Sequence, residues 1–342
     1  MISNQTFRTI QWPVALPSCT VVVCTRRRPK ELSRCLESLQ KLRYPQVSVL
    51  VIENDASSTE AEEIARSYDA QYHLCTRRGL SAARNFGVRL CNTELIAFID
   101  DDATCDPDWL SQAVPLFGDP AVFAVTGKIL FHADGNFFSP AAHEFDPADR
   151  IVSNQTSDWF GMANFGGLGL GSNFLIRKSA WHRIGGFDER LGRGSPLHCS
   201  EENDFLFRLL DAGMSVATRS QAIVRHPTPK PCSAEEATRS IASATVMVSM
   251  LGIEHPRHLL KLAKYLWGAV VRKPQPWRER PAHLFGNMAS RKTVYAALAR
   301  GPFIYLSATL NQIRLGTPHF LAGLSESGLA DRVSESADVR AS

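Results

Sequence analysis

Short apolar runs alternate with amphipathic segments over the first hundred residues of the chain. Strands are expected at 20–23, 47–52, 71–74 and 94–99, and helices from Pro29, near 60–68 and from Ser81 to about Cys91. Most of the strand runs are rich in Val, Ile and Leu on both faces, which is typical of strands buried on both sides of a sheet. Leu32, Leu36 and Leu39 recur at helical spacing and mark one apolar face. This alternation predicts an α/β fold with a mostly parallel sheet between helices.

The pattern changes after residue 121. Strands are expected at 121–129 and 172–177 with a loop-rich stretch between them, and the chain beyond 233 is more helical and more basic. The last residues are rich in Ser, Glu, Asp and Ala, a composition typical of disorder. The expected organisation is an irregular lead-in at 1–18, an α/β domain at 19–232, a helical C-terminal region at 233–322 and a disordered tail at 323–342.

Three polar clusters follow expected strands at the point where each strand ends. They are Thr25-Arg26-Arg27-Arg28, Glu53-Asn54-Asp55 and Asp100-Asp101-Asp102. In parallel α/β sheets, ligands bind beyond the carboxyl ends of the strands. The three clusters therefore predict one shared site at that edge of the sheet.

The aspartate cluster is the sharpest chemical signal in the chain. Successive side chains of an extended segment alternate, so Asp100 and Asp102 should point the same way. Neighbouring carboxylates repel unless a cation or hydrogen-bond donors lie between them, and Mg²⁺ accepts one or two carboxylates together with substrate phosphates. The alternative is an acidic loop or a helix N-cap run before Pro107. The position directly after a buried strand favours a metal site.

Two further places carry candidate chemistry but have structural explanations as well. The acidic run Ser200-Glu201-Glu202-Asn203-Asp204 opens an expected helix, where acids are favoured by the free amides and the helix dipole. His226 follows the apolar run 222–224, and most histidines in such places are satisfied partners rather than metal ligands. The glycines at 166–171 lack the spacing of a phosphate-binding loop, which disfavours a Rossmann dehydrogenase.

The composition excludes several classes of protein. The 342 residues carry a net charge of only +4, with 44% hydrophobic and 21% charged residues, which is ordinary for a globular protein and not for a dedicated nucleic-acid binder. None of the eight cysteines forms a C-x-x-C pair, and this favours a reduced compartment. The N-terminus lacks a signal-peptide pattern, and no run reaches the roughly 18 apolar residues of a membrane span. A cytoplasmic protein is expected.

Six stretches of the chain together resemble glycosyltransferase family 2, whose members have the GT-A fold. In chain order they are VVVCTRRRP, VIENDASS, RRGLSAARNFG, FIDDDATCDPDWL, GSNFLIRKSAWHRIGGFDERL and SEENDFLFRLLDAG, and they span roughly residues 19–228. Each stretch alone is weak evidence, but six in the family's order are strong. The resemblance implies an enzyme that moves a sugar from a nucleoside-diphosphate donor to an acceptor hydroxyl, with inversion at the anomeric carbon.

The resemblance also implies roles for individual residues. The nucleotide-sugar donor would lie against Thr25, Arg27, Glu53, Asp55, Arg78, Arg84, Asp100 and Asp101. Asp102 and His226 would hold Mg²⁺ or Mn²⁺ against the diphosphate. The pair Glu201-Glu202 would supply the catalytic base. The second acid of the family's pair usually takes this role, but it is usually Asp, so the choice between Glu201 and Glu202 stays open. Glu53 also departs from the family's usual Asp.

Substrates and rival functions are less constrained. The donor stays open between UDP-, GDP- and dTDP-sugars, and the acceptor would be a glycan or a lipid-linked molecule in cell-surface glycan or polysaccharide synthesis. Processive synthases of the family carry membrane helices and a Q-x-x-R-W motif, whereas Gln275-Pro276-Trp277-Arg278 has the wrong spacing, so single-sugar addition is expected. Two alternatives remain, a sugar nucleotidyltransferase and a non-catalytic nucleotide-sugar-binding protein. The first would require a glycine-rich signature after the first strand.

Residues 257–300 combine an apolar stretch with ten Lys or Arg residues and a single acid. Leu259, Leu260, Leu262 and Trp267 belong to the apolar stretch. Two interpretations stay open. Either this helix packs onto the α/β domain with its basic residues in solvent, or it makes a peripheral contact with an anionic membrane. Such a contact would place the protein at the inner face of the cytoplasmic membrane.

Overall fold

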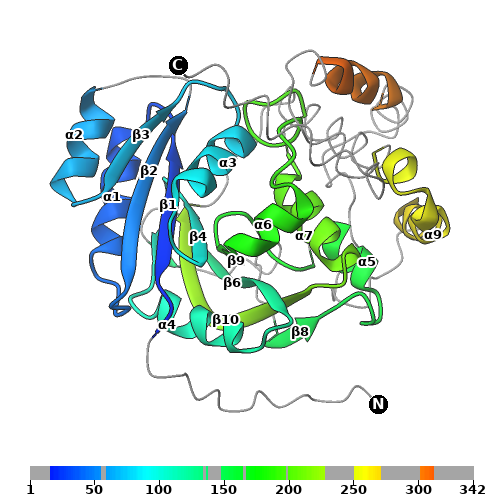
Figure 1. Cartoon of the computed structure of the whole chain (residues 1–342), viewed down its shortest axis with the longest axis horizontal. Helices are drawn as coiled ribbons and strands as arrows, with labels where there is room; N and C mark the ends of the chain where they lie inside the picture. The colour runs from blue at the N-terminus through cyan, green and yellow to red at the C-terminus, as the bar shows by residue number, and fades with distance from the viewer. Residues whose placement is uncertain are drawn as a thin grey trace, which may run out of the picture.

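The structure, a computed structural model, describes residues 16–54, 59–133, 136–137, 148–164, 167–197, 199–227, 250–270 and 301–311. A ten-stranded sheet runs through the molecule and is flanked by helices (Figure 1). The strands are β1 (Cys19–Thr25), β2 (Val47–Asn54), β3 (Gln71–Cys75), β4 (Leu95–Asp100), β5 (Thr104–Cys105), β6 (Val122–Ala133), β7 (Asn136–Phe137), β8 (Arg150–Val152), β9 (Phe174–Arg177) and β10 (Ser215–Pro227). The helices are α1 (Pro29–Leu39), α2 (Thr59–Ser67), α3 (Leu80–Leu90), α4 (Trp109–Ala113), α5 (Trp159–Asn164), α6 (Lys178–Ile184), α7 (Glu201–Asp211) and α9 (Leu259–Val270), with 3-10 turns η1 (Val114–Gly118) and η2 (Pro256–His258).

The sheet has a parallel half and a mixed half. In the first half β3, β2, β1 and β4 are neighbours and pair in parallel. In the second half β9 lies antiparallel between β4 and β6, and β6 pairs in parallel with β10. Because β9 reverses the direction twice, β4, β6 and β10 all point the same way. The expected α/β class is confirmed, and the expected strands at 20–23, 47–52, 71–74 and 94–99 are β1 to β4.

Two apolar layers, one on each face of the sheet, form the core. Alternate residues of β1 divide between them, since Val22 joins the layer under α3 and α7 while Val21 and Val23 join the layer under α1 and α4. This period-2 division is what a strand buried on both faces requires. Leu32, Leu36 and Leu39 of α1 are almost fully buried, as their helical spacing predicts.

Helices of the C-terminal region pack beside α5 and α7. Residues 250–254 and 301–311 are helical, and Leu251 and Leu262 join the core layer under α7. None of the helices in the described ranges is long and apolar enough to cross a membrane. Seven cysteines lie in the described part of the chain, and all are free. The expected boundary at 232, the tail at 323–342 and most of the lead-in at 1–18 lie outside the described residues.

Candidate active site

The carboxyl ends of β1, β2, β4 and β10 meet at one edge of the sheet and open onto a cavity of about 580 Å³. This volume is typical of pockets that bind small molecules. Nine of the residues expected to form the site line the cavity, namely Thr25, Arg78, Arg84, Asp100, Asp101, Asp102, Glu201, Glu202 and His226. The structure therefore brings together side chains that are up to two hundred residues apart in the chain.

Asp101, unlike its two neighbours, contacts the end of β1. Its carboxylate accepts hydrogen bonds from Thr25 Oγ1 at 2.7 Å and from Arg28 Nη1 at 3.1 Å. Burial raises the pKa of Asp101 to about 6, against the opposing charge of Arg28. Thr25 is almost fully buried, so its hydroxyl is committed to this contact. Asp101 and Thr25 thus join the ends of β1 and β4 at the floor of the cavity.

Asp100 and Asp102 both face His226, as expected, but a turn brings them together rather than an extended segment, because β4 ends at Asp100 and the Ala103 amide donates to the Asp100 carbonyl at 3.0 Å. Nε2 of His226 lies 3.1 Å from Asp102 Oδ1 and 3.7 Å from Asp100 Oδ2. Burial alone would lower the pKa of His226, but the hydrogen bonds and charges of the two aspartates outweigh it and raise the pKa to about 10. Burial would raise the pKa of Asp102, yet His226 and then Arg28 lower it to about 2.

The arrangement around His226 fits a divalent cation. His226 Nδ1 lies 2.7 Å from the carbonyl oxygen of Pro227, which only accepts hydrogen bonds, so Nδ1 carries the proton in the neutral ring. The lone pair of Nε2 then faces a carboxylate, and this is favourable only with a proton or a cation between them. Ligand atoms of Asp100, Asp102 and His226 lie within 4.8 Å of one another. Carboxylate oxygens suit Mg²⁺ or Mn²⁺, and imidazole is a common metal ligand.

Arg84 is a buried cation at the centre of the cavity wall. From α3 it donates to Glu201 Oε1 at 2.9 Å and to the carbonyl oxygen of Gly171 at 3.2 Å, and it lies 3.6 Å from Asp100 Oδ1. A Cβ at position 171 would lie 2.6 Å from Arg84 Nη2, so glycine there leaves room for the guanidinium in this position. Arg84 therefore neutralises Glu201 and connects the first turn of α7 to the metal-site aspartates.

Glu202 lines the same cavity without such a partner. In the described part of the chain no side chain donates a hydrogen bond to its carboxylate, in contrast to Glu201. Burial, followed by the charge of Glu201, raises the pKa of Glu202 to about 8. The two acids at the start of α7 are thus in different states, because Glu201 is held by Arg84 while Glu202 faces the cavity with a raised proton affinity.

Two expected site residues, Arg27 and Glu53, are not among the described residues that line the cavity. Arg27 is exposed in a left-handed conformation, with φ of 56°. Glu53 is fully buried and accepts a hydrogen bond from the Tyr72 hydroxyl at 2.6 Å. Asp55 lies outside the described residues. The structure therefore does not bring Arg27 or Glu53 into contact with the cavity.

Several residues line the cavity that the sequence did not single out. Arg28 contacts both Asp101 and Asp102, the latter at 2.8 Å. Asn54 accepts from the Gly79 amide and donates to the Arg77 carbonyl, so it fixes the loop that carries Arg78. Of the three arginines at the end of β1, Arg26 and Arg28 line the cavity, whereas Arg27 between them is exposed in a left-handed backbone conformation.

Comparison with known proteins agrees with this geometry. Residues 20–185 match the model of glycosyl transferase family 2. The chain carries a glycosyl transferase family 2 domain. That match begins in β1 and ends after α6, so it includes the three aspartates and Arg84 but not the acids of α7 or His226.

Relatives of the family 2 domain include a pre-mycofactocin glycosyltransferase of Mycobacterium tuberculosis, 28% identical over 218 residues, covering 60% of this chain and 42% of that protein. A succinoglycan biosynthesis protein, ExoM, of Rhizobium meliloti is 28% identical over 217 residues, covering 61% of this chain and 66% of that protein. The chain thus spans less than two thirds of the length of these relatives.

Solved structures share the fold. TarS of S. aureus (residues 1–349), in complex with UDP-GlcNAc, has a TM-score of 0.55 and 15% identity, covering 88% of this chain and 92% of that chain. The mannosyltransferase PcManGT of Pyrobaculum calidifontis, in complex with GDP-Man and Mn²⁺, has a TM-score of 0.51 and 17% identity, covering 88% of both chains. The expected GT-A fold is confirmed.

Proposed function

We propose that the chain is an inverting glycosyltransferase that moves a single sugar from a nucleoside-diphosphate donor to an acceptor hydroxyl. One observation carries the proposal: a carboxyl group with raised pKa, Glu202, shares one cavity with the Asp100–Asp102–His226 cluster. A catalytic base whose pKa lies near the working pH is efficient. The family match at 20–185 and the glycosyltransferase relatives support the same reaction class.

In the proposed reaction Glu202 accepts the proton of the acceptor hydroxyl. The acceptor oxygen then forms a bond to the anomeric carbon as the bond from that carbon to the diphosphate oxygen breaks. The electron pair leaves with the nucleoside diphosphate. A single displacement assisted by one base inverts the anomeric configuration, as in inverting glycoside hydrolysis. Arg84 holds Glu201 in an ion pair, so that Glu202 is left as the acid that faces the cavity and exchanges a proton.

Asp100, Asp102 and His226 would hold Mg²⁺ or Mn²⁺ at this site. The ion would neutralise charge on the leaving diphosphate. PcManGT binds GDP-Man and Mn²⁺, and this supports a metal-assisted donor site. Arg28 and Arg78 line the cavity close to the aspartates and are suited to the negative charge of a diphosphate.

A donor screen tests the proposal. One of the UDP-, GDP- or dTDP-sugars should raise the unfolding temperature by several degrees in the presence of Mn²⁺, because a ligand at a hundredfold excess over its Kd adds about 2.7 kcal/mol of stability. The measurement is thermal unfolding with each donor, with and without Mn²⁺, followed by detection of released nucleoside diphosphate. Stabilisation by nucleoside triphosphate and sugar phosphate, with pyrophosphate release, would instead indicate a nucleotidyltransferase. Stabilisation without turnover would indicate a binding protein.

We also propose that the acceptor is reached at a membrane surface. Leu260 of α9 is 88% exposed and Phe303 is 75% exposed, while Lys261 and Lys264 are exposed on the same helix as Leu260. Leu262 of α9 is buried, so the helix packs onto the domain and still presents apolar and basic side chains to solvent. Such surfaces bind anionic headgroups, and basic residues contribute about 1 kcal/mol each. Residues 271–300 of the expected membrane contact lie outside the described residues.

Vesicle co-sedimentation is expected to show this attachment. The protein should bind vesicles that contain phosphatidylglycerol and should detach as salt rises, because screening weakens the attraction of the basic residues. Leu260→Ser should weaken binding severalfold. Leu74→Ser, at an exposed leucine of β3 on the other side of the sheet, is the matched control and should bind like the unmodified protein. Failure to bind anionic vesicles at low salt would contradict the attachment.

A further inference from the structure

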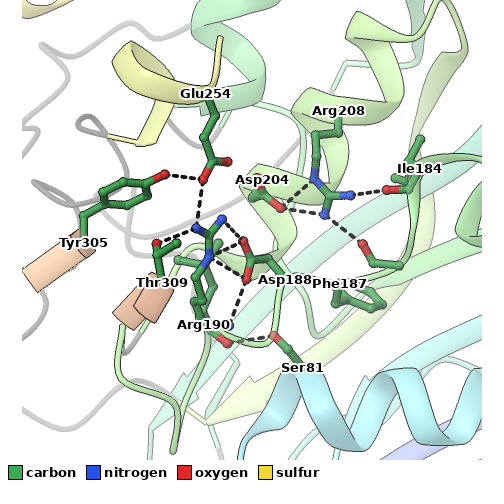
Figure 2. Close-up of polar contacts among 12 residues, drawn as sticks. Ser81, Ile184, Phe187, Asp188, Arg190, Asp204, Arg208, Glu254, Tyr305 and Thr309 are labelled. Atoms are coloured by element: carbon green, nitrogen blue, oxygen red, sulfur yellow. Dashed lines mark hydrogen bonds and ion pairs between the residues drawn. The ribbon is translucent and has the colours of Figure 1, made fainter. Parts of the chain in front are cut away.

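An ion-pair network lies outside the cavity, around Arg190, which is buried together with Asp188, while Glu254 is partly exposed. Figure 2 shows its guanidinium between Asp188 on one side and Glu254 and Thr309 on the other. Nε donates to both carboxylate oxygens of Asp188 at 3.0 and 2.9 Å, and Nη1 donates to Glu254 Oε1 at 2.8 Å and to Thr309 Oγ1 at 3.0 Å. Tyr305 completes the network, because its hydroxyl donates to Glu254 at 2.7 Å and its ring lies under the guanidinium.

The partners of Arg190 come from three separate parts of the chain. Asp188 is two residues away and would neutralise Arg190 without further help. Glu254 and Thr309 lie on the helices at 250–254 and 301–311, which are 64 and 119 residues further along. One guanidinium therefore joins both C-terminal helices to the α/β domain.

The segment that carries Arg190 also forms one wall of the cavity. We call residues 187–197 the wall segment. Arg193 and Gly194 line the cavity, and Gly192 lies so close to Glu201 that a Cβ there would meet its carboxyl carbon at 3.2 Å. The carbonyl of Arg193 accepts from the Leu80 amide at 2.9 Å, and the carbonyl of Leu191 accepts from Ser81 Oγ at 2.7 Å. The wall segment thus contacts α3 and the start of α7 on its cavity side.

On its outer side the wall segment packs against the C-terminal helices. Leu191 and Leu197 form a small apolar cluster with Met250, Tyr305 and Ala308. Gly192 and Gly194 have positive φ angles of 96° and 84°, a conformation that glycine leaves as readily as it adopts. Backbone hydrogen bonds within the wall segment, such as that from the Leu197 amide to the Arg190 carbonyl at 2.8 Å, hold part of its geometry, and side-chain anchors add to them.

We propose that Arg190 is a positioning residue, which ties the wall segment to both C-terminal helices and so makes these helices part of the catalytic unit. This rests on the proposed transferase function. Buried ion pairs add little net stability over apolar replacements, because desolvation offsets most of the attraction, but a hydrogen-bonded network favours a single arrangement. The role of the network is then to fix Arg193, Gly192 and, through Gly192, the acids at the start of α7.

The test changes Glu254, a member of the network that does not line the cavity. Glu254→Gln removes the charge that faces Arg190 and leaves Asp188 in place, so the variant should fold. It should lower kcat/KM roughly tenfold, within the range of about a hundredfold that a misplacement of 1 Å costs. Glu254→Asp keeps the charge and should recover part of the loss. Hydrogen exchange of the amides in the wall segment should become faster in Glu254→Gln.

Arg257→Gln is the matched control. Arg257 pairs with Asp211 at the other end of α7, so this variant also removes an ion pair between the C-terminal region and the domain, but away from the wall segment. Measured without membranes and with a soluble acceptor, so that the proposed membrane contact plays no part, it should keep the exchange rates of the wall segment and kcat/KM of the unmodified protein. Equal exchange rates in the wall segment of Glu254→Gln and Arg257→Gln would overturn the proposal. Faster exchange in Glu254→Gln with unchanged kcat/KM would overturn it as well.

The two readouts separate this proposal from the proposed function. If the unmodified protein transfers no sugar from any donor, the proposed function fails before the variants are compared. Hydrogen exchange reports the anchoring of the wall segment without any substrate. Lower kcat/KM together with faster exchange in Glu254→Gln, and neither change in Arg257→Gln, would support the positioning role.

Discussion

Replacing Glu202 by glutamine should reduce sugar transfer by two to four orders of magnitude and leave donor binding in place. The amide has nearly the same shape as the carboxyl group but does not accept a proton from the acceptor hydroxyl. Donor binding should persist because Arg28, Arg78 and the metal-site aspartates are unchanged. The measurements are steady-state rates for transfer and thermal shifts for donor binding with Mn²⁺.

Glu201→Gln is the matched control, since it makes the same chemical change one residue away. Glu201 is buried against Arg84 with a 2.9 Å contact. Breaking one partner of a buried pair leaves the other charge uncompensated and costs about 3–5 kcal/mol. This variant should therefore lose stability first, seen as a lower unfolding temperature. An active Glu202→Gln together with a stable, inactive Glu201→Gln would show that the base is Glu201.

The pH dependence of kcat/KM is a second test of Glu202 as the proposed base. A base acts only when it is deprotonated, so a raised pKa means that activity is lost as the pH falls through that raised value. At saturating Mn²⁺, the acid limb of kcat/KM should lie well above the range of an ordinary glutamate, whose pKa is about 4.3. That limb should disappear in the residual activity of Glu202→Gln.

The sequence was enough for the parallel half of the sheet, because β1, β2 and β4 are largely apolar runs, and buried strands are recognised without knowledge of the strands that they pair with. The position of the Asp100-Asp101-Asp102 cluster, directly after a buried strand, was also enough to predict a site there, although a turn at 101–102, and not alternation along an extended segment, orients Asp100 and Asp102. The structure confirms that both face His226.

Features that depend on contacts between distant parts of the chain could not be predicted from the sequence. β9 lies between β4 and β6 because it pairs with β4, a strand about 80 residues earlier in the chain. Which of Glu201 and Glu202 acts as the proposed base depends on Arg84, which pairs with Glu201 and is 117 residues from it in the chain. Arg26 and Arg28 line the cavity, whereas Arg27 is exposed in a left-handed backbone conformation. The anchoring of the wall segment by Glu254 and Thr309 has no sequence pattern at all.

Replacing Asp102 by asparagine should abolish donor binding that depends on a divalent ion and leave the fold intact. The change removes one negative charge from the Asp100–Asp102–His226 cluster, and the amide is a far weaker ligand for a hard cation than the carboxylate. Asp102 also pairs with Arg28 at 2.8 Å, but Arg28 keeps its contact with Asp101 at 3.1 Å. The measurement is the thermal shift produced by the donor with and without Mn²⁺, together with Mn²⁺-dependent transfer.

Asp106→Asn is the matched control for this variant. Asp106 lies four residues further along and pairs with Arg225 at 3.1 Å, next to His226 in the chain, but does not line the cavity. It should keep Mn²⁺-dependent donor binding, because no ligand atom of the cluster changes. Mn²⁺-dependent transfer at the unmodified rate in Asp102→Asn would remove the metal from the proposed mechanism. Loss of binding in Asp102→Asn alone, at an unchanged unfolding temperature without ligand, would assign the ion to this cluster, since both variants remove a carboxylate that pairs with an arginine but only Asp102→Asn removes a ligand atom of the cluster.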